Sequence, residues 1–372
     1  MNSSELVDPI YGPELDSPLS DDRVLVPRLA RHQIVMPDGH LVGVTVAGAG
    51  VPLVVVHGFS AEGFLYAQSL SRLVKMGFRV IAIDTAGHGA TQGLPLNGQN
   101  MNAYAELLGN VIDELGIKRY IVAGHSMGGQ LVTRLAAARP EQVMALMLID
   151  AIVGDTWDWM VRAFRVNPPL LVGVGGVLLV DSASVIPTFT DPRQATKLIR
   201  LVAPTLAGHA VQPWRLLGPM MSILRTRASR HALNKIQSND IPVFVLHGAW
   251  DVAVPHRTGV DAARRTDGVL VTVEHAGHSW ILRDPETLPS IFNELLGAEL
   301  GEAIRDGLQK AGLKGKGTSI KEIERVCYNR NARVFSLTAA DSIPKPVGRH
   351  RRPKYGWTVD RYQGHQKVRA GQ

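Results

Sequence analysis

The fold of this chain is decided by the stretch Tyr120-Ile121-Val122-Ala123-Gly124-His125-Ser126-Met127-Gly128-Gly129. An apolar run typical of a buried strand leads into Gly-x-Ser-x-Gly, and a helical pattern follows at 130–138. The glycines beside Ser126 permit a tight, strained turn that projects the serine Oγ above the sheet. This context favours a nucleophilic serine over a structural one, and it makes the N–H of Met127 a donor to an oxyanion.

Outside this stretch, short apolar runs alternate with helical patterns. The apolar runs are 53–56, 80–83, 120–123, 145–149, 243–246 and 269–273, and the helical patterns are 65–76, 101–115, 130–138, 258–265 and 288–296. A strand pair at 33–36 and 41–46 around an Asp-Gly turn precedes them. Continuously apolar strands between helices are typical of a mostly parallel sheet with helices on both faces. We therefore predict an α/β fold.

The alternation stops between residues 152 and 240, where the patterning is helical. We interpret this stretch as a helical cap inserted into a core formed by 31–151 and 241–297. Residues 1–30 form a loose, proline-punctuated lead, and 298–317 form a helix and linker. A chain of 372 residues is long for one ordinary core, which agrees with a large domain plus additional segments.

The charge of the chain is unevenly distributed. The sequence has 40 Lys and Arg against 33 Asp and Glu, a net charge of +7. Residues 298–372 hold 16 basic and 7 acidic side chains, so the rest holds 24 and 26. The basic character therefore belongs to the C-terminal segment and says nothing about the substrate of the core.

Cysteine content and hydropathy exclude several classes of protein. A single cysteine, Cys327, excludes an internal disulfide framework and a cysteine-rich zinc site, and we expect no cofactor and no metal. The first 20 residues have no apolar run after a basic start, so we expect no secretory signal. The most apolar stretch, Pro168–Val180, is about 13 residues long, short of the roughly 20 that span a bilayer. We expect a cytoplasmic protein with no transmembrane segment.

Three further segments resemble the α/β-hydrolase fold superfamily, and the resemblance covers residues 31–297. His57-Gly58-Phe59 follows the run 53–56 and is similar to the oxyanion loop, which implies the N–H of Phe59 as the second donor. The segment 247–255 is similar to the acid loop, which implies Asp251 as the orienting carboxylate. The segment 276–279 is similar to the histidine loop, which implies His278 as the base.

The resemblance implies a catalytic triad of Ser126, Asp251 and His278, in the chain order that this superfamily uses. His278 would take the proton from Ser126 as the serine attacks an acyl carbonyl, and Asp251 would hold the imidazole in place. A serine at position 126 argues against the haloalkane dehalogenase and epoxide hydrolase branches, which use carboxylate nucleophiles. Asp150, which follows the run 145–149, is an alternative acid. His57 and His125 are expected in supporting roles.

Our leading hypothesis is a capped, cofactor-free serine hydrolase that cleaves a carboxylic ester or thioester of a small to medium substrate. The scarcity of charge from residue 167 to residue 180 favours an apolar substrate. The same triad would serve hydrolysis of a carbon–carbon bond or cofactor-free perhydrolysis. A hypothesis from another class is a DNA-binding regulatory protein whose hydrolase-like domain senses a small ligand.

The basic segment 318–372 resembles the winged helix-turn-helix domains of the excisionase and MerR type. Two helical patterns, 318–326 and 332–340, precede a basic loop with Pro344-Lys345-Pro346, and Tyr355–Asp360 follows. The resemblance implies a second helix in a DNA major groove and a wing, 349–354, on phosphate. The alternative is a disordered basic tail that binds polyanions without specificity or only keeps the protein soluble.

Overall fold

The computed structural model of the chain describes residues 25–26, 29–95, 100–184, 211–226, 228–314, 319–337, 345–346 and 352–368, with isolated positions between 196 and 208. Most of the predicted N-terminal lead lies outside the described residues. So do residues 315–318 of the predicted linker and tail, and residues 349–351 of the predicted wing.

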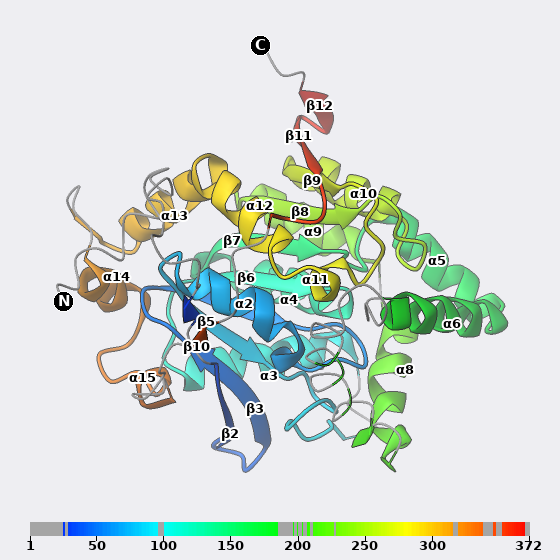
Figure 1. Cartoon of the computed structure of the whole chain (residues 1–372), viewed down its shortest axis with the longest axis horizontal. Coiled ribbons are helices and arrows are strands. Elements are labelled where there is room, and N and C mark those ends of the chain that lie inside the picture. Colours follow the sequence, from blue (N-terminus) through cyan, green and yellow to red (C-terminus); the bar gives the residue numbers. More distant parts are fainter. Residues whose placement is uncertain are drawn as a thin grey trace.

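A ten-stranded sheet forms the centre of the molecule, in the order β12-β11-β9-β8-β7-β6-β4-β5-β3-β2 (Figure 1). Its strands are β2 (Ala30–Val35), β3 (Leu41–Ala47), β4 (Val51–Val56), β5 (Phe78–Ile83), β6 (Tyr120–His125), β7 (Val143–Ile149), β8 (Val243–Gly248), β9 (Val269–Val273), β11 (Trp357–Gln363) and β12 (Gln366–Val368). Neighbouring strands from β5 to β9 are parallel, and the pairs at both edges are antiparallel. The predicted α/β fold with a mostly parallel sheet is confirmed. A separate pair joins β1 (Leu25–Val26) to β10 (Lys345–Pro346).

Helices cover both faces of this sheet (Figure 1). On one face lie α2 (Ala67–Val74), α11 (Trp280–Arg283), α12 (Thr287–Leu296), α13 (Glu299–Lys310) and α14 (Ile320–Cys327). On the other lie α3 (Met101–Glu114), α4 (Met127–Ala138), α9 (Arg230–Ser238) and α10 (His256–Thr266). Every residue of β4, β5, β6, β7 and β8 is buried, which explains why these strands are apolar throughout instead of alternating.

The inserted segment connects β7 to β8, which are neighbours in the sheet. It comprises α5 (Asp155–Val166), α6 (Pro169–Ser184), the short 3₁₀ helix η4 (Pro213–Leu216), α8 (Leu217–Arg225) and α9. Because α9 packs on α4 and α10, this last helix belongs to the layer that covers the sheet, although the predicted cap range 152–240 included it. From η4, Arg215 donates to the backbone oxygen of Thr91 at 2.9 Å, in the segment that follows β5. Among the described helices, α6 included, none is both long and apolar enough to cross a membrane.

The C-terminal segment packs on the core along both its helices and its strands. Helix α14 begins at a capping box between Ser319 and Glu322, and its buried residues Ile323, Val326 and Cys327 join the core cluster. Further on, β11 pairs antiparallel with β9, with Trp357 opposite Val273. The tail therefore completes the same core instead of building its own.

This arrangement differs from the separate winged helix-turn-helix unit that the sequence predicted. Of the expected second helix, 332–340, residues 338–340 lie outside the described residues, and residues 334–337 form the helix α15 (Val334–Leu337). The expected continuation of the wing, Tyr355–Asp360, instead leads into a strand of the main sheet. The apolar side chains of α14 bury against β4 and α13, which removes the need for an independent core. A nucleic-acid partner for residues 318–372 stays a prediction.

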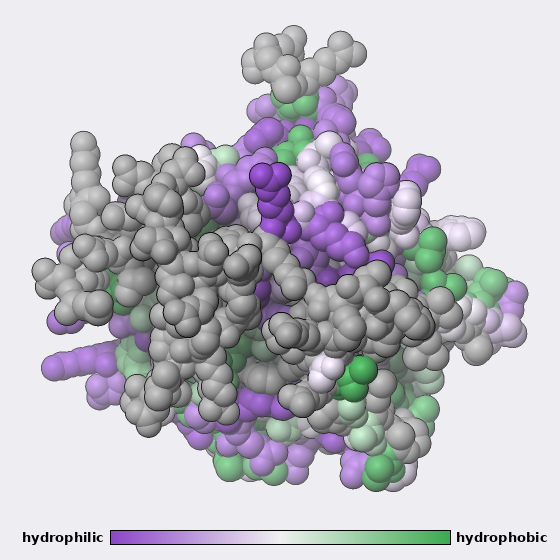
Figure 2. All heavy atoms as spheres, viewed as in Figure 1, coloured by the Kyte–Doolittle hydropathy of each residue, from purple (hydrophilic) through white to green (hydrophobic). Residues whose placement is uncertain are grey.

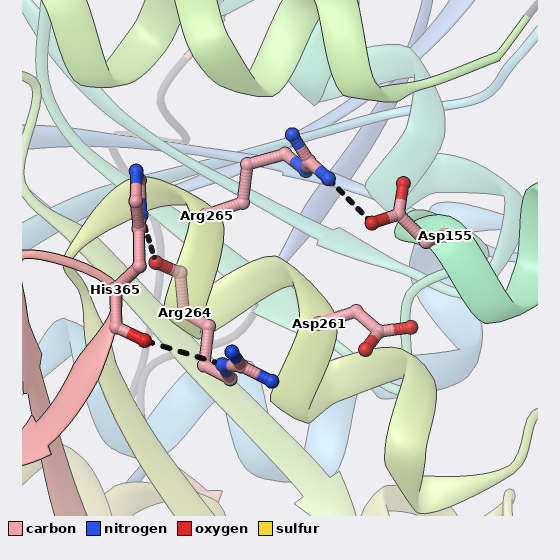
Figure 3. A pocket seen from close by; sticks show the side chains of 5 residues that line it. All are labelled: Asp155, Asp261, Arg264, Arg265 and His365. Carbon is pink, nitrogen blue, oxygen red and sulfur yellow. Dashed lines mark hydrogen bonds and ion pairs between the residues drawn. The ribbon is translucent and has the colours of Figure 1, made fainter.

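The turn between β11 and β12 is fixed to helix α10 (Figure 3). His365 donates from its backbone N–H to Asp267 at 2.7 Å, and its backbone oxygen accepts from Nε of Arg264 at 3.3 Å. Beside this turn lies a surface cavity of about 260 Å³, whose wall includes Arg265 in an ion pair with Asp155. The β11–β12 turn is thus attached to α10, and the neighbouring arginine on α10 contacts the first turn of α5.

Candidate active site

Ser126 occupies the turn between β6 and α4 with φ 53° and ψ −116°, a backbone conformation that is strained for a residue with a side chain. Its backbone N–H donates to the oxygen of Ile149 at 2.9 Å, and its backbone oxygen accepts from Ile152 at 3.2 Å. A Cβ added at Gly128 would lie 2.2 Å from the backbone oxygen of Val56, so a glycine is required where helix and strand approach. The predicted strand–turn–helix around Ser126 is therefore present. Backbone hydrogen bonds to Ile149 and Ile152 hold Ser126 in its strained backbone conformation.

Asp251 and His278 lie in contact at the carboxyl ends of β8 and β9. Nδ1 of His278 is 2.7 Å from Oδ2 of Asp251. The other carboxylate oxygen, Oδ1, accepts from the backbone N–H groups of Ala253 and Val254 at 3.0 and 2.8 Å. The backbone thus fixes the carboxylate, Nδ1–H of the imidazole donates a hydrogen bond to it, and Nε2 of His278 is the ring nitrogen left to exchange a proton.

The ionisation of His278 is dominated by nearby acids. Burial alone would lower its pKa, but the charge and hydrogen bond of Asp251, followed by the charges of Asp150 and Asp181, raise the pKa of His278 to about 9. Burial would likewise raise the pKa of Asp251, yet the facing imidazole holds that pKa below its usual range. The pair therefore favours an imidazolium beside a carboxylate in the free protein.

Asp150, the alternative acid, lies at the end of β7 and is completely buried. Its two oxygens accept from the backbone N–H of Gly248 at 2.8 Å and from Nε1 of Trp280 at 2.6 Å. Burial, and then the negative charge of Asp251, raise the pKa of Asp150 well above its usual range. Within the described residues, Asp150 acts on His278 only through its electric charge. The carboxylate that accepts the hydrogen bond of the imidazole is that of Asp251.

The two predicted oxyanion donors lie on either side of the serine. Met127 opens helix α4, so its N–H has no partner within the helix. The loop of Phe59 lies against the serine, because a Cβ added at Gly58 would be 3.1 Å from Cβ of Ser126. In the part of the chain that the structure describes, neither the Phe59 nor the Met127 N–H donates a hydrogen bond. Both are therefore available to an oxygen bound above Ser126.

A chain of hydrogen bonds joins this oxyanion loop to the histidine loop. The N–H of Gly58 donates to Oη of Tyr66 at 3.4 Å, and Tyr66 Oη lies 2.9 Å from Nδ1 of His125. Nε2 of His125 lies 3.2 Å from the backbone oxygen of His278. We assign the protons so that Tyr66 donates to His125 and His125 donates to His278. Burial lowers the pKa of His125 to about 3, so this histidine is a neutral connector.

The ring of His57 contacts the backbone of the oxyanion loop. Its Nε2 accepts from the backbone N–H of Thr85 at 2.9 Å, and its Nδ1 lies 2.8 Å from the backbone oxygen of Gly58. The ring is fully buried. It therefore joins the ends of β4 and β5 and fixes the backbone that presents Phe59.

One contact from the inserted segment reaches the histidine loop. Asp181, on α6, accepts from the backbone N–H of Ser279 at 2.7 Å. Ser279 is the next residue after His278, so the carboxylate of Asp181 adds to the negative charge around the imidazole. No sequence motif marks this residue, although it carries one signal: Asp181 is the one charged residue in the apolar sequence of α6.

No sequence motif marks Tyr66 or Trp280 either. Tyr66 follows the oxyanion segment by only a few residues, and Trp280 lies two residues after His278, but nothing in their local sequence marks either as a polar contact. Their roles follow from tertiary hydrogen bonds that only the fold brings about.

A set of buried side chains close to this site has the composition of a metal site. The ligating atoms of Asp150, His247 and Asp251 lie within 4.8 Å of one another. However, all the carboxylate oxygens already accept hydrogen bonds, and Nε2 of His247 lies 2.8 Å from the backbone oxygen of Val254, to which it donates. These contacts occupy both carboxylates and Nε2 of His247, whereas Nδ1 of His247 is buried without a hydrogen-bond partner among the described residues. We assign no metal to the set.

Comparisons with known proteins concern the family and the fold. The sequence profile of the alpha/beta hydrolase family matches residues 53–288. A putative non-heme haloperoxidase of Mycobacterium phage D29 is 32% identical over 260 residues, which cover 68% of this chain and 90% of that protein. A pimeloyl-[acyl-carrier protein] methyl ester esterase of Nitrosomonas europaea is 27% identical, covering 68% of this chain and 98% of that protein.

Solved structures share the fold at lower identity. An esterase from Exiguobacterium antarcticum matches 72% of this chain and 99% of its own, with a TM-score of 0.55 and 21% identity. A serine hydrolase involved in carbazole degradation covers the same shares with a TM-score of 0.58 and 20% identity. Both leave more than a quarter of this chain unmatched.

Proposed function

This chain belongs to the alpha/beta hydrolase family and is a hydrolase, and from that premise we propose that it cleaves a carboxylic ester or thioester through an acyl-enzyme. The observation that carries the proposal is the 2.7 Å contact between Asp251 and His278, together with a serine held in a strained turn at the end of β6 in the same sheet. A relative that is a methyl ester esterase supports the choice of bond.

In the proposed mechanism, Oγ of Ser126 attacks the acyl carbonyl while Nε2 of His278 takes its proton. The new oxyanion accepts from the N–H groups of Phe59 and Met127. The imidazolium, stabilised by Asp251, then protonates the leaving alcohol or thiol as its bond to carbon breaks. Water, deprotonated by the same imidazole, releases the acid and restores Ser126. Loss of one oxyanion donor typically costs about 3–4 kcal/mol in the barrier.

Exposed apolar side chains on the inserted helices favour an apolar substrate. Leu170 and Val177 of α6 and Leu217 of α8 are exposed, and Figure 2 shows apolar side chains at the right and lower right of the view, where these helices lie. We propose that the substrate is small to medium in size and that α6 and α8 form part of its cover.

The test is a chain-length series of p-nitrophenyl esters, together with labelling by a fluorophosphonate. We expect hydrolysis by the wild-type protein, loss of at least 1,000-fold (an order-of-magnitude expectation) in Ser126→Ala, and a single labelled residue, Ser126. Retained hydrolysis in Ser126→Ala, or a wild-type protein that no fluorophosphonate labels, would refute the proposal.

A second candidate reaction is cofactor-free perhydrolysis, favoured by the haloperoxidase relative at 32% identity. The acyl-enzyme would be attacked by hydrogen peroxide instead of water. The peroxide oxygen bonds to the acyl carbon while His278 takes the peroxide proton. The bond between the acyl carbon and Oγ of Ser126 then breaks, and His278 returns the proton to Oγ, which yields a peracid and the free serine. The ratio of peracid to carboxylic acid, measured at a fixed peroxide concentration in wild type and Ser126→Ala, tests this reaction. Peracid formation that survives loss of Ser126 would exclude it.

A further inference from the structure

Helix α6 reaches the loop of the proposed catalytic histidine through one side chain. Oδ2 of Asp181 accepts from the N–H of Ser279 at 2.7 Å. The other oxygen lies against the preceding glycine, because a Cβ added at Gly277 would be 2.4 Å from Oδ1 of Asp181. The carboxylate therefore rests on the backbone of the residues on either side of His278, where any larger side chain at position 277 would displace it.

The placement of this acid is unusual for its helix. The sequence of α6, PLLVGVGGVLLVDSAS, carries no other charge, and an isolated carboxylate on an apolar helix is favourable only where it finds donors. Asp181 is half-buried and finds a donor in the histidine loop. Figure 1 shows α6 beside α11, the helix that follows this loop.

We propose that Asp181 is a positioning residue that joins the inserted helix α6 to the loop of His278, so that the seating of this helix controls the catalytic base. The inference rests on the proposed function, since it assigns a role within that site. When α6 packs against the histidine loop, Asp181 accepts from the backbone N–H of Ser279 and adds a negative charge near the imidazole of His278. When α6 moves away, both the hydrogen bond and the charge are lost.

His278 faces charged and titratable groups from several elements. They are Asp251 and His247 from β8 and the loop after it, Asp150 after β7, His125 at the end of β6, and Asp181 from α6. Burial lowers the pKa of His125 to about 3 and that of His247 to about 4, so both are neutral near pH 7. Of the three acids, Asp181 alone belongs to the inserted segment and is the one that a movement of this segment would remove.

The first test separates charge from hydrogen bonding. Asp181→Asn keeps an oxygen that accepts from Ser279 but removes the charge, and Asp181→Ala removes both. The pKa of His278 is measured by NMR titration of its ring, identified by its absence in His278→Gln. We expect a pKa near 9 in the wild type that falls by roughly half a unit to one unit in both variants. Asp155→Asn removes a charge from the first turn of α5 and serves as the control, with no shift expected. An unchanged pKa in Asp181→Asn would overturn the proposal.

The second test follows the loop itself. Hydrogen exchange of the peptide that contains the Ser279 amide should be slow in wild type and in Asp181→Asn, and at least about tenfold faster in Asp181→Ala. Equal exchange in all three proteins would overturn the proposal. Both readouts are independent of turnover. A protein that hydrolyses no ester but shows the pKa and exchange changes would therefore refute the proposed function and leave the role of Asp181 in place.

Discussion

The guanidinium of Arg79 on β5 lies 2.6 Å from the carboxylate of Glu324 on α14, and only 6% of the arginine side chain is exposed. The same guanidinium lies over the rings of Tyr328 and Phe335, 5.5 and 5.0 Å from their centroids. A buried charge on β5 is therefore in contact with a carboxylate and two aromatic rings of the C-terminal segment. This segment is part of the folded core, and its loss would remove these contacts from a buried cation.

Glu324→Gln should therefore destabilise the whole protein. The variant keeps the size of the side chain but removes the carboxylate charge that contacts the buried Arg79, and we expect the free energy of unfolding to fall by about 2–3 kcal/mol. Urea denaturation measures the change. Arg325→Gln, at the exposed neighbouring position on α14, should remain within about 0.5 kcal/mol of wild type. Equal stability of both variants would contradict the docking of α14.

The single thiol of the chain provides a second readout of this docking. Cys327 is completely buried on α14, and burial raises the pKa of its thiol to about 12. A thiol reagent should modify it only when α14 leaves the core, slowly in wild type and about tenfold faster in Glu324→Gln. Immediate labelling of the native wild type would show that α14 is not docked.

Substitution of Asp251 and substitution of Asp150 should have different effects on activity and on stability. Asp251→Asn places an amide against Nδ1 of His278, and we expect kcat/KM to fall by about 1,000- to 10,000-fold. Asp150→Asn should leave most of the activity but destabilise the fold by about 1–3 kcal/mol, because an amide nitrogen replaces one of two buried acceptors. Ester hydrolysis and urea denaturation of both variants measure the difference. If Asp150→Asn alone abolished turnover, Asp150 would be the orienting acid.

Activity and stability should respond to pH in opposite directions. Only the neutral form of His278 accepts a proton, so with a pKa of about 9 kcat/KM should rise nearly tenfold per unit from pH 7 and level off above pH 9. The charged form stabilises the fold, because its pKa lies above the unfolded value of about 6.5. That contribution is complete below pH 6.5 and disappears as the pH rises through 9, a loss on the order of 3 kcal/mol. His278→Gln should lack this decline in pH-dependent denaturation, and a flat kcat/KM profile between pH 7 and 9 would contradict the assigned pKa.

Alanine substitution at two glycines, Gly128 and Gly173, should change the stability of the protein by very different amounts. In Gly128→Ala the new methyl group meets the backbone oxygen of Val56, so we expect a loss of more than about 2 kcal/mol in stability together with loss of turnover. In Gly173→Ala, on the exposed face of α6, nothing lies within 4 Å, and the change should be neutral or stabilising by up to about 1 kcal/mol. Thermal unfolding compares them. Similar losses at both sites would argue against the close approach at Gly128.

The sheet and the segments around Ser126, Asp251 and His278 could be predicted because their signals are local. Each is a short apolar run that ends in a turn, and parallel strands bring such ends to one edge. The position of β11 could not be predicted in this way. Its burial is only partial, and its partner, β9, lies far away in the sequence.

Other parts of the site escaped prediction for a related reason. The contact between Asp181 and Ser279 joins residues 98 positions apart, and that between Tyr66 and His125 joins residues 59 apart. Each depends on how the inserted segment or a loop folds back, which periodicity does not encode. The basic composition of the tail is evident from the sequence, but composition does not reveal that Ile323, Val326 and Cys327 are buried in the core cluster.

The pairing of Arg79 with a residue 245 positions later has a consequence for synthesis on the ribosome. When the family-matched segment 53–288 has emerged, β9 still lacks its neighbour β11, and the arginine lacks its carboxylate. The nascent domain therefore exposes an open sheet edge until residues 357–363 have also been made. Completion of the core thus waits for a segment that is translated well after the hydrolase segment, and a chain truncated between the two would yield a substrate for chaperones and proteases.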